Sequence, residues 1–414
     1  MIKLCVLGLG YIGLPTALLF ANNGMDVVGV DINERVVNTL KDCKMPFEEK
    51  GFQELLDGAC KKESFRASTK VEKADVFLVA VPTPFDAELR MADLKYVVSA
   101  CEMIIPHLEK GNIVIIESTI PPKTCEKRVR RILERSGLKA SQDFYISHCP
   151  ERAIPGNTLH EMVNNDRVIG GLDEKATELT RDLYSSFVKG NLYLTTSTTA
   201  EMIKLMENTY RDVNIALANE LSMLAEDYDI NIWEAIEIAN KHPRVNIHKP
   251  GPGVGGHCIA IDPWFLTENT SDSSLITLAR NINDSMPIHV LKKVKDLVNG
   301  IENPVITVFG VAYKGDIADT RATPALKFIK LAEKEGFTIR IYDPFVKEFE
   351  YPILSLEEAV KGSDCIVVLT DHSEFREMNP DDLYHMMKNP NIVDSKNVLS
   401  KQTGLELNYN KSIA

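Results

Sequence analysis

The 414-residue sequence contains no apolar run that approaches the roughly 20 residues a helix needs to cross a bilayer. It also lacks an excess of basic residues: its net charge is −12, which disfavours nucleic acid and anionic membrane surfaces as partners. Its first residues carry no basic segment followed by a long apolar one, so we expect no signal peptide. With 44% hydrophobic and 26% charged residues, the chain is predicted to be a cytoplasmic globular protein of two or three domains.

Paired cysteine motifs are absent too. None of the eight cysteines stands in a CxxC motif, and several lie inside apolar runs such as residues 3–6. This pattern suits a reducing compartment, so we expect neither disulfides nor a structural zinc, and no metal centre. The cysteines are Cys5, Cys43, Cys60, Cys101, Cys125, Cys149, Cys258 and Cys365.

What is present begins with a glycine turn between two expected strands. Residues 2–7 and 25–30 form apolar strands, with the turn 8–13 (GLGYIG) and an apolar helix to residue 22 between them. Strand, glycine turn, helix, strand and then an acid, Asp31, is the order of a dinucleotide-binding fold. The alternative is a tight strand-to-helix turn without a ligand. The expected cofactor contacts are Gly8, Gly10, Tyr11, Ile12, Gly13, Asp31 and Arg35.

The acid after the second strand favours NAD over NADP as cofactor. The Asp31 carboxylate would accept a hydrogen bond from the ribose 2′-hydroxyl and repel a 2′-phosphate. Arg35 slightly weakens this preference, unless it is a surface residue that packs on the adenine.

Three polar residues follow three further expected strands, at 75–81, 112–118 and 144–147. They are Thr83, Thr119 and Glu151. Ligands of open α/β sheets bind at the carboxyl ends of the strands, so three polar residues there favour a site over simple turn formers. Residues 167–170 and 191–195 are expected to add two more strands.

The middle of the chain is predicted to be helical. A capping box at 198–201 opens a helix that continues to about residue 229. Lys204, Asn208 and Arg211 share one face of it, which is either functional or simply solvated. A second helix at 232–241 and a third at 273–300, interrupted at Pro287, complete this part. A long amphipathic helix of this kind often carries a dimer interface.

A glycine-rich loop at 251–256 precedes Cys258, and Asp262 follows four residues later. Glycines leave room for a backbone to fold closely around a ligand and to present one thiol to it. Such a thiol can act as a nucleophile when its thiolate is stabilised. The alternative is a turn beside a buried structural cysteine.

The C-terminal part repeats the strand and helix order of the N-terminal part. Its turn at 310–315 (GVAYKG) lacks GxGxxG and is not expected to bind a second NAD. Lys314 and Arg321 suggest a different phosphate ligand there, or are two surface cations. We therefore predict an α/β protein with two doubly wound Rossmann-like domains, 1–197 and 301–414, joined by a mostly helical domain with a long helix, 198–300.

Four motifs occur in order: GxGxxG, Lys204-xxx-Asn208, GxGxGGxCxxxD at 251–262, and 313–321 (YKGDIADTR). With them the whole chain resembles the nucleotide-sugar 6-dehydrogenases of the UDP-glucose/GDP-mannose dehydrogenase superfamily. The segments 150–152, 242–246 and 255–264 are most similar to the members that oxidise UDP-N-acetyl-D-mannosamine. UDP-glucose dehydrogenases carry an aromatic residue and a lysine where this chain has Ile259 and Ile261, which argues against UDP-glucose.

The resemblance implies that a UDP-sugar is oxidised at C6 from alcohol to carboxylate in two hydride transfers to NAD. Cys258 would be the nucleophile, forming a thiohemiacetal and then a thioester. Lys204 would be the base or electrostatic partner, and Asn208 would orient the reacting oxygen. Asp262 and Glu151 are both candidates for handling the hydrolytic water.

The resemblance also assigns binding residues. Arg321, like Thr83 and Thr119, is expected near the cofactor, and Arg244 is expected to reach the neighbouring subunit's site in a homodimer. The expected substrate contacts are Arg152, Ala153, Lys204, Asn208, Arg211, His242, Arg244, Gly255, Tyr313 and Lys314.

Other functions remain as alternatives. The substrate could be UDP-N-acetylglucosamine or UDP-glucose. A two-electron hydroxyacid dehydrogenase would leave Cys258 and residues 304–414 without a role. A non-catalytic binder of NAD or a nucleotide sugar would not need a thiol behind a glycine loop.

Overall fold

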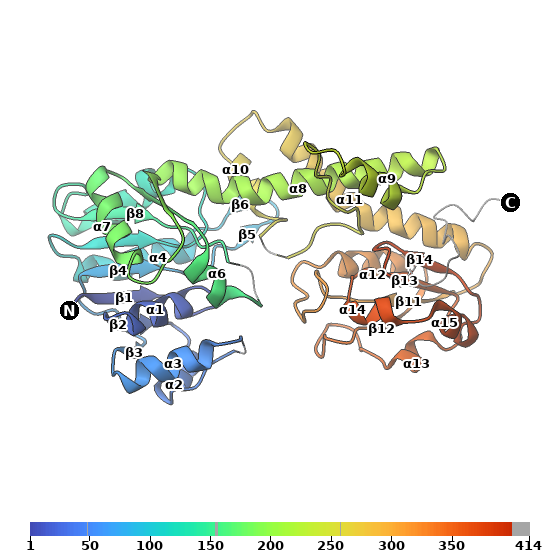
Figure 1. Ribbon diagram of the computed structural model, residues 1–414, viewed down its shortest axis with the longest axis horizontal. Coiled ribbons are helices and arrows are strands. Elements are labelled where there is room, and N and C mark those ends of the chain that lie inside the picture. Colours follow the sequence, from blue (N-terminus) through green and yellow to red (C-terminus); the bar gives the residue numbers. More distant parts are fainter. Residues whose placement is uncertain (48, 154–155, 257, 400–414) are drawn as a thin grey trace. The chain divides into compact units, whose positions relative to one another are not determined.

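The computed structural model of the chain describes residues 1–47, 49–153, 156–256 and 258–399. His257, which belongs to the segment 255–264, lies outside these residues. The end of the expected C-terminal domain lies outside them too. The chain divides into two compact units (Figure 1). Unit 1 comprises Met1–Glu207 and Trp264–Asn269, and unit 2 comprises Asn208–Pro263 and the chain from Thr270 onward.

Unit 1 is built on an eight-stranded sheet of order β10-β9-β8-β7-β4-β1-β2-β3. Its pairs are parallel except β8 with β9, which is antiparallel. Alternate residues of each strand point to opposite faces, so the sheet separates two apolar clusters. The strands are β1 (Lys3–Leu7), β2 (Asp26–Val30), β3 (Phe65–Ser68), β4 (Val76–Val79), β7 (Ile113–Ile116), β8 (Tyr145–His148), β9 (Arg167–Gly171) and β10 (Leu192–Thr196).

Helices cover both faces of this sheet. One face packs against α1 (Gly13–Asn22), α3 (Phe52–Lys61), α6 (Thr158–Asn164) and α7 (Glu174–Tyr184). The other packs against α4 (Lys95–Ile104) and α5 (Arg130–Leu133) with the π-helical turn before it (Cys125–Val129). The remaining elements are two 3-10 turns (Ile105–His107, Glu134–Ser136), α2 (Glu34–Lys41), α10 (Asp262–Thr267) and the hairpin of β5 (Phe85–Asp86) and β6 (Met91–Ala92).

The expectation that all cysteines are reduced is wrong. Cys43, just after α2, and Cys60, on α3, form a disulfide with their Cα atoms 6.5 Å apart. A separation of 17 residues in the sequence carries no recognisable signature, and only the packing of two unforeseen helices brings these thiols together. The other cysteines form no disulfide within the described residues, and all of them except Cys258 are buried.

Unit 2 contains a four-stranded parallel sheet of order β12-β11-β13-β14. Its strands are β11 (Val305–Phe309), β12 (Thr338–Tyr342), β13 (Cys365–Val368) and β14 (Ile392–Asp394). One face packs on α11 (Ser274–Leu297) and α12 (Pro324–Lys334). The other packs on α13 (Leu356–Val360), α14 (Ser373–Glu377) and α15 (Pro380–Met386). The predicted pair of Rossmann-like sheets is therefore confirmed.

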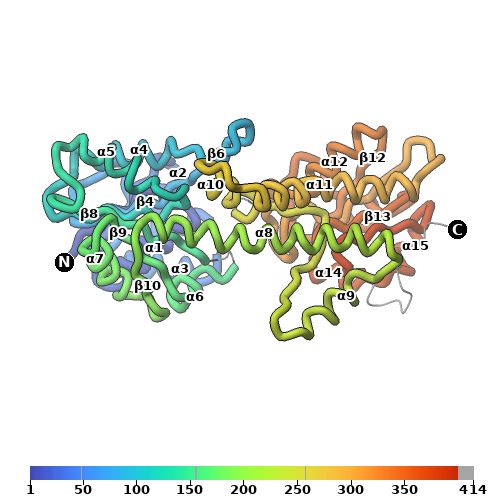
Figure 2. The backbone as a smooth tube through the Cα atoms, turned by 90° about the horizontal axis from the view of Figure 1, so that it is seen from above, coloured from blue at the N-terminus to red at the C-terminus, as the bar shows by residue number. Residues whose placement is uncertain are grey.

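The predicted long helix is also confirmed: α8 (Ser197–Asp227) runs for 31 residues as one continuous helix (Figure 2). The capping box expected at its start is wrong. Thr196 accepts the Thr199 N–H instead, and the buried Glu201 carboxylate accepts the backbone N–H groups of Lys123 and Cys125. Tertiary contacts thus take the carboxylate that a capping box would use.

Unit 2 also contains the helices α9 (Ile232–Ala239) and α11. Pro287 does not interrupt α11, contrary to expectation. The buried Arg280 of α11 pairs with the buried Asp212 of α8 at 2.5 Å, which holds the two helices together before the proline. Asn283 adds a hydrogen bond to the Asp212 carbonyl at 2.9 Å. No helix of the described residues combines the length and apolarity needed to span a membrane.

Candidate active site

The glycine turn of unit 1 leaves its backbone open at one position only. Gly8 has φ +95°, and a Cβ there would lie 2.6 Å from the Ala80 carbonyl oxygen. A Cβ on Gly13 would lie 2.0 Å from the Gly8 carbonyl oxygen, so turn and helix meet without space for a side chain. A Cβ on Gly10 would meet nothing within 4 Å. The open backbone beside the N-terminus of α1 fits a dinucleotide pyrophosphate.

Asp31 lies at the end of β2, where the turn fixes it. Its Oδ2 accepts the Leu9 N–H at 2.9 Å, and its Oδ1 accepts the Asn33 N–H at 2.8 Å. The residue is half-buried, so its remaining lone pairs can still accept from a ribose hydroxyl. Arg35 is exposed in the first turn of α2.

The polar residues expected after the strands of unit 1 all follow its carboxyl edge. Thr83 follows β4, Thr119 follows β7, and Glu151 follows β8. The Thr83 hydroxyl is buried and has no hydrogen-bond partner among the residues that the structure describes. An unpaired buried hydroxyl is costly unless a ligand or water pairs with it, so this edge fits the cofactor that the glycine turn implies. Thr119 is half-buried.

Glu151 is held by its own loop and by a buried arginine that the sequence did not reveal. Its Oε1 accepts the N–H groups of Arg152 and Ala153, at 2.6 and 2.8 Å. Its Oε2 forms an ion pair with Arg167, whose side chain is 4% exposed. Arg167 also pairs with the buried Glu117 at 3.4 Å. Arg167 begins an ordinary apolar strand, β9, and nothing in the sequence distinguishes it from a surface residue.

Arg152, expected to bind substrate, is engaged within unit 1. Its guanidinium forms an ion pair with Glu207 of α8 at 2.5 Å and also donates to the Asp166 carbonyl. Its side chain is therefore fixed in place beside the start of β9.

The thiol loop is packed against the turn of the C-terminal sheet. A Cβ on Gly255 would lie 2.7 Å from the Tyr313 Cβ and 2.8 Å from the Pro324 Cδ. The Gly256 N–H donates to the Arg321 carbonyl at 3.0 Å. Only glycines allow this close approach, and it leaves Cys258 exposed at the end of the loop.

Two polar side chains interact electrostatically with that thiol. The hydrogen bond from Arg321 to Asp319 raises the pKa of Arg321, and the charge of Cys258 acts in the same direction. Burial raises the pKa of Tyr313, with contributions from the charges of Asp319 and Cys258. Arg321 binds Asp319 through Nε and Nη2, so its guanidinium is oriented beside the thiol loop. The role of Asp319 was not foreseen, although it lies inside a quoted motif.

Asn208 and Asp262 form a buried pair. The Asn208 amide donates to the Asp262 carboxylate at 2.6 Å, and the two residues are 8% and 3% exposed. Lys204 lies one turn earlier on α8 and is half-buried, while Arg211 lies one turn later and is exposed. At Asn208 this face of the helix is therefore not a solvated stripe.

The remaining expected substrate residues are exposed side chains of unit 2. His242 and Arg244 follow α9, and the His242 ring accepts the Arg244 N–H at 3.3 Å. Lys314 is exposed in the turn after β11. Within the described residues, no cluster of three His, Cys, Asp or Glu side chains could hold a metal ion.

Three family models match the chain in succession. Their descriptions are the NAD binding domain, the central domain and the UDP binding domain of the UDP-glucose/GDP-mannose dehydrogenase family, over residues 2–188, 198–285 and 307–401. A UDP-N-acetyl-D-mannosamine dehydrogenase of Methanocaldococcus jannaschii is 50% identical, over 97% of this chain and 93% of that one.

Two solved structures are similar over nearly the full length. The UDP-D-ManNAc dehydrogenase of Pyrococcus horikoshii has a TM-score of 0.91 and 43% identity, over 96% of each chain. The UDP-N-acetyl-mannosamine dehydrogenase of Staphylococcus aureus has a TM-score of 0.89 and 44% identity, over 96% of this chain and 95% of that one.

Proposed function

Because the chain belongs to the UDP-glucose/GDP-mannose dehydrogenase family, we propose that it oxidises UDP-N-acetyl-D-mannosamine at C6 to UDP-N-acetyl-D-mannosaminuronate with NAD. The substrate is that named for relatives 43–50% identical to it. The observation that carries the chemistry is an exposed Cys258 behind glycines that pack on Tyr313, with Arg321 bonded to the same loop.

Two oxidations of one carbon need different groups from the protein. NAD supplies the hydride acceptor for both. In the first, Lys204 takes up or stabilises the hydroxyl proton, and Asn208 orients the oxygen. In the second, the Cys258 thiolate adds to the aldehyde carbon, the C=O π bond breaks, and the resulting thiohemiacetal oxyanion can expel a hydride. Loss of the second hydride leaves a thioester on Cys258, which water cleaves to carboxylate and thiol.

The surroundings of Cys258 support a thiolate. A guanidinium beside a thiol favours its ionised form. Asp319 holds Arg321 through two of its nitrogens, so we assign Arg321 to this role in addition to its expected place near the cofactor.

The contacts of the Glu151 carboxylate argue against Glu151 as the residue that handles the hydrolytic water, which leaves Asp262 as our proposal. Both oxygens of Glu151 are engaged, one by two backbone N–H groups and the other by Arg167. We assign Glu151 to holding the 151–153 turn, and with it Arg152 and Ala153, in position. Asp262 fixes the Asn208 amide and lies four residues from the thiol.

Binding of the nucleotide is proposed to fall to unit 2, which contains the segment matched by the UDP binding domain model. Exposed cations, together with Tyr313, suit a diphosphate and its sugar, whereas Gly255 is buried against Tyr313 and Pro324. The cations are Arg211, His242 when protonated, Arg244 and Lys314. We propose that the chain forms three domains with separate functions, at residues 1–197, 198–300 and 301–414.

We further propose a cytoplasmic homodimer in which Arg244 serves the neighbouring subunit's site. Support comes from an apolar groove of about 330 Å³ between α8 and α9, lined by residues such as Leu224, Tyr228 and Ile236. Leu224 and Tyr228 are large apolar side chains left exposed on it. Light scattering should report twice the chain mass for the wild type, and a monomer for Leu224→Glu.

The test of function is the number of NADH molecules formed for each UDP-N-acetyl-D-mannosamine consumed. We expect two in the wild type, and a loss of carboxylate formation by at least about 10³-fold in Cys258→Ser. UDP-glucose serves as the control substrate and should be oxidised far more slowly. A ratio of one, or full turnover in the serine variant, would exclude the thioester route. Faster oxidation of UDP-glucose would overturn the choice of substrate.

A further inference from the structure

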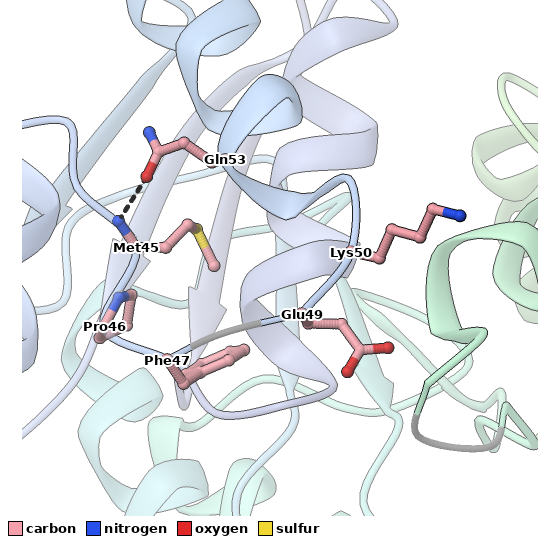
Figure 3. Close-up of a pocket in the computed structure, with 6 residues that line it drawn as sticks. All are labelled: Met45, Pro46, Phe47, Glu49, Lys50 and Gln53. Carbon is pink, nitrogen blue, oxygen red and sulfur yellow. Dashed lines mark hydrogen bonds between the residues drawn. The ribbon is translucent and has the colours of Figure 1, made fainter.

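The segment between α2 and α3 has no role in the function proposed above. We call its described residues, 44–47 and 49–51, the Phe47 loop. The loop is anchored beside the Cys43–Cys60 disulfide. Gln53 of α3 accepts the Met45 N–H at 3.0 Å and donates to the Cys43 carbonyl at 3.0 Å (Figure 3).

At its centre the loop contacts the glycine turn through one pair of rings. The ring of Phe47 stacks on Tyr11, in the middle of the glycine turn, with centroids 4.3 Å apart and planes at 26°. Phe47 also meets the Phe52 ring at the start of α3, at 6.0 Å and 69°. Tyr11 is 46% exposed even so, and Phe47 is the aromatic side chain that stacks on it. Phe47 therefore supports one side of the Tyr11 ring.

At its other end the loop is bonded to the segment after Ala153. The Glu49 carboxylate accepts the Gly156 N–H at 2.9 Å and the Thr158 hydroxyl at 3.0 Å. The loop thus joins the glycine turn to the segment that carries Arg152 and Ala153.

The loop has room to move once its anchor is released. A cavity of about 760 Å³ adjoins it, lined by Met45, Pro46, Phe47, Glu49, Lys50 and Gln53 (Figure 3). The loop begins directly after Cys43, so the disulfide fixes its first residue to α3, and reduction would release that end.

We propose that Phe47 is a positioning residue for the dinucleotide site, and that the Cys43–Cys60 disulfide sets its position, so that a dithiol reductant weakens NAD binding. The inference rests on the glycine turn being the cofactor site and not on the identity of the sugar. In the reaction the S–S bond breaks, each cysteine sulfur gains one electron and one proton, and the dithiol is oxidised to its own disulfide.

The first experiment measures NADH binding by fluorescence in Cys258→Ser protein, because that background removes the reactive thiol. Thiols are counted before and after treatment with dithiothreitol, and two new ones are expected in each chain. Reduction should raise the Kd for NADH about fivefold, because the competent arrangement of the loop is then only partly populated. Two new thiols with an unchanged Kd would overturn the redox coupling.

A second set of variants separates positioning from general stability. In the same background, Cys43→Ser with Cys60→Ser should show the raised Kd without reductant and no response to dithiothreitol. Phe47→Ala should raise the Kd under both conditions, while Phe47→Tyr, which keeps a ring on Tyr11, should restore it. Lys44→Ala, an exposed change in the same loop, is the matched control and should leave the Kd unchanged.

The outcomes distinguish this inference from the proposed function. Normal NADH binding by Phe47→Ala would overturn the positioning role and leave the cofactor site intact. Equal loss of binding in Phe47→Ala and Phe47→Tyr would overturn the stack as its cause. Failure of the oxidised parent protein to bind NADH would overturn the cofactor site and the inference with it.

Discussion

The molecule contains two turns at corresponding places, 8–13 (GLGYIG) and 310–315 (GVAYKG), for which we propose different ligands. Each follows a central strand, β1 or β11, and each begins at a glycine with positive φ. The first turn enters α1 directly at Gly13. The second is followed by the segment with Asp319 and Arg321 before α12 begins at Pro324. A helix N-terminus therefore stands at the first turn, and cationic side chains stand at the second.

The decisive difference is the third residue of the turn. A Cβ on Gly10 would meet nothing within 4 Å. Its counterpart Ala312 is 2% exposed, and its carbonyl accepts the Thr370 hydroxyl at 2.7 Å. Open backbone can receive a pyrophosphate, whereas the sealed turn cannot.

The acids after the second strands differ in the same sense. Asp31 is half-buried and accepts two backbone N–H groups. Asp343 is 5% exposed and accepts four backbone N–H groups, two from residues 311–312 and two from residues 345–346, besides bonding to His372. The acid after the second strand therefore stabilises the turn in both units. It can also bind a ribose only where the turn leaves its carboxylate accessible.

Among the substitutions that test this comparison, we expect the largest effect from Asp343→Asn, on the free energy of unfolding. An amide group would face backbone N–H donors in a buried site, which should lower the free energy of unfolding by about 2–4 kcal/mol. Urea unfolding measures this. Asp296→Asn, a change at an exposed carboxylate in the same unit, is the control and should cost less than about 1 kcal/mol. Equal costs would mean that Asp343 is no more structural than a surface acid.

The carboxylate of Asp343 also makes the free energy of unfolding depend on pH, in a direction that can be derived. Burial acts to raise the pKa of Asp343, but hydrogen bonds from His372 and the backbone hold it below its ordinary value. Its contribution is therefore present above the unfolded-state pKa, about 3.9, and is lost as the pH falls through the lower folded value. Acid titration of stability should be flatter in Asp343→Asn below about pH 4.

The next effect is on the cofactor, in Gly10→Val. The φ of Gly10 lies outside the left-handed region and its surroundings are open, so the variant should fold with an unchanged thermal midpoint. The new side chain would occupy the place of the pyrophosphate, and the Kd for NADH should rise about 100-fold. The reciprocal change, Ala312→Gly, should create no second NADH site. Calorimetric titration tests both variants, and tight binding by Gly10→Val would place the dinucleotide elsewhere.

A smaller effect is expected from Asp31→Asn. Asparagine keeps an acceptor for the turn but removes the charge that repels a 2′-phosphate. The Kd for NADH should rise about tenfold, and discrimination against NADPH should fall, with less than about 1 kcal/mol lost in stability. A loss of stability as large as that of Asp343→Asn would show that both acids are structural.

Patterns in the sequence were enough to predict both sheets, the long helix and the thiol loop. Those predictions rest on local rules: glycines needed at turns, apolar runs for buried strands, and a helix pattern without breakers. The thiol loop and Tyr313 come together because Gly255 and Gly256 carry no side chain that would prevent this contact.

The features that were missed depend on contacts between distant segments. Nothing local marks Arg167 as the buried partner of Glu117 and Glu151, or Cys43 as the partner of Cys60. The capping box failed for the same reason, since Glu201 satisfies backbone groups 76 and 78 residues away. Local patterns predict what a segment can form, and tertiary packing decides which partner it takes.

The smallest expected effect concerns Glu201. Folding shifts the pKa of its carboxyl group in the direction opposite to the shift at Asp343. Burial raises the pKa of Glu201 to about 7, despite hydrogen bonds from the backbone of residues 123–125. The folded state then holds a proton that the unfolded state releases near pH 4.5, so this contribution is present below the unfolded value and is lost as the pH rises through about 7. We expect urea unfolding to show a decline of about 1 kcal/mol or more between pH 5 and pH 8.

Glu201→Gln should reduce that decline, because it keeps an acceptor but cannot titrate. Glu220→Gln, an exposed change on the same helix, should leave the decline unchanged. Burial also raises the pKa of Glu117 to about 7, so part of the slope should persist in Glu201→Gln. If stability instead rose between pH 5 and pH 8 in the wild type, Glu201 and Glu117 would be ionised in the folded state, as Asp343 is.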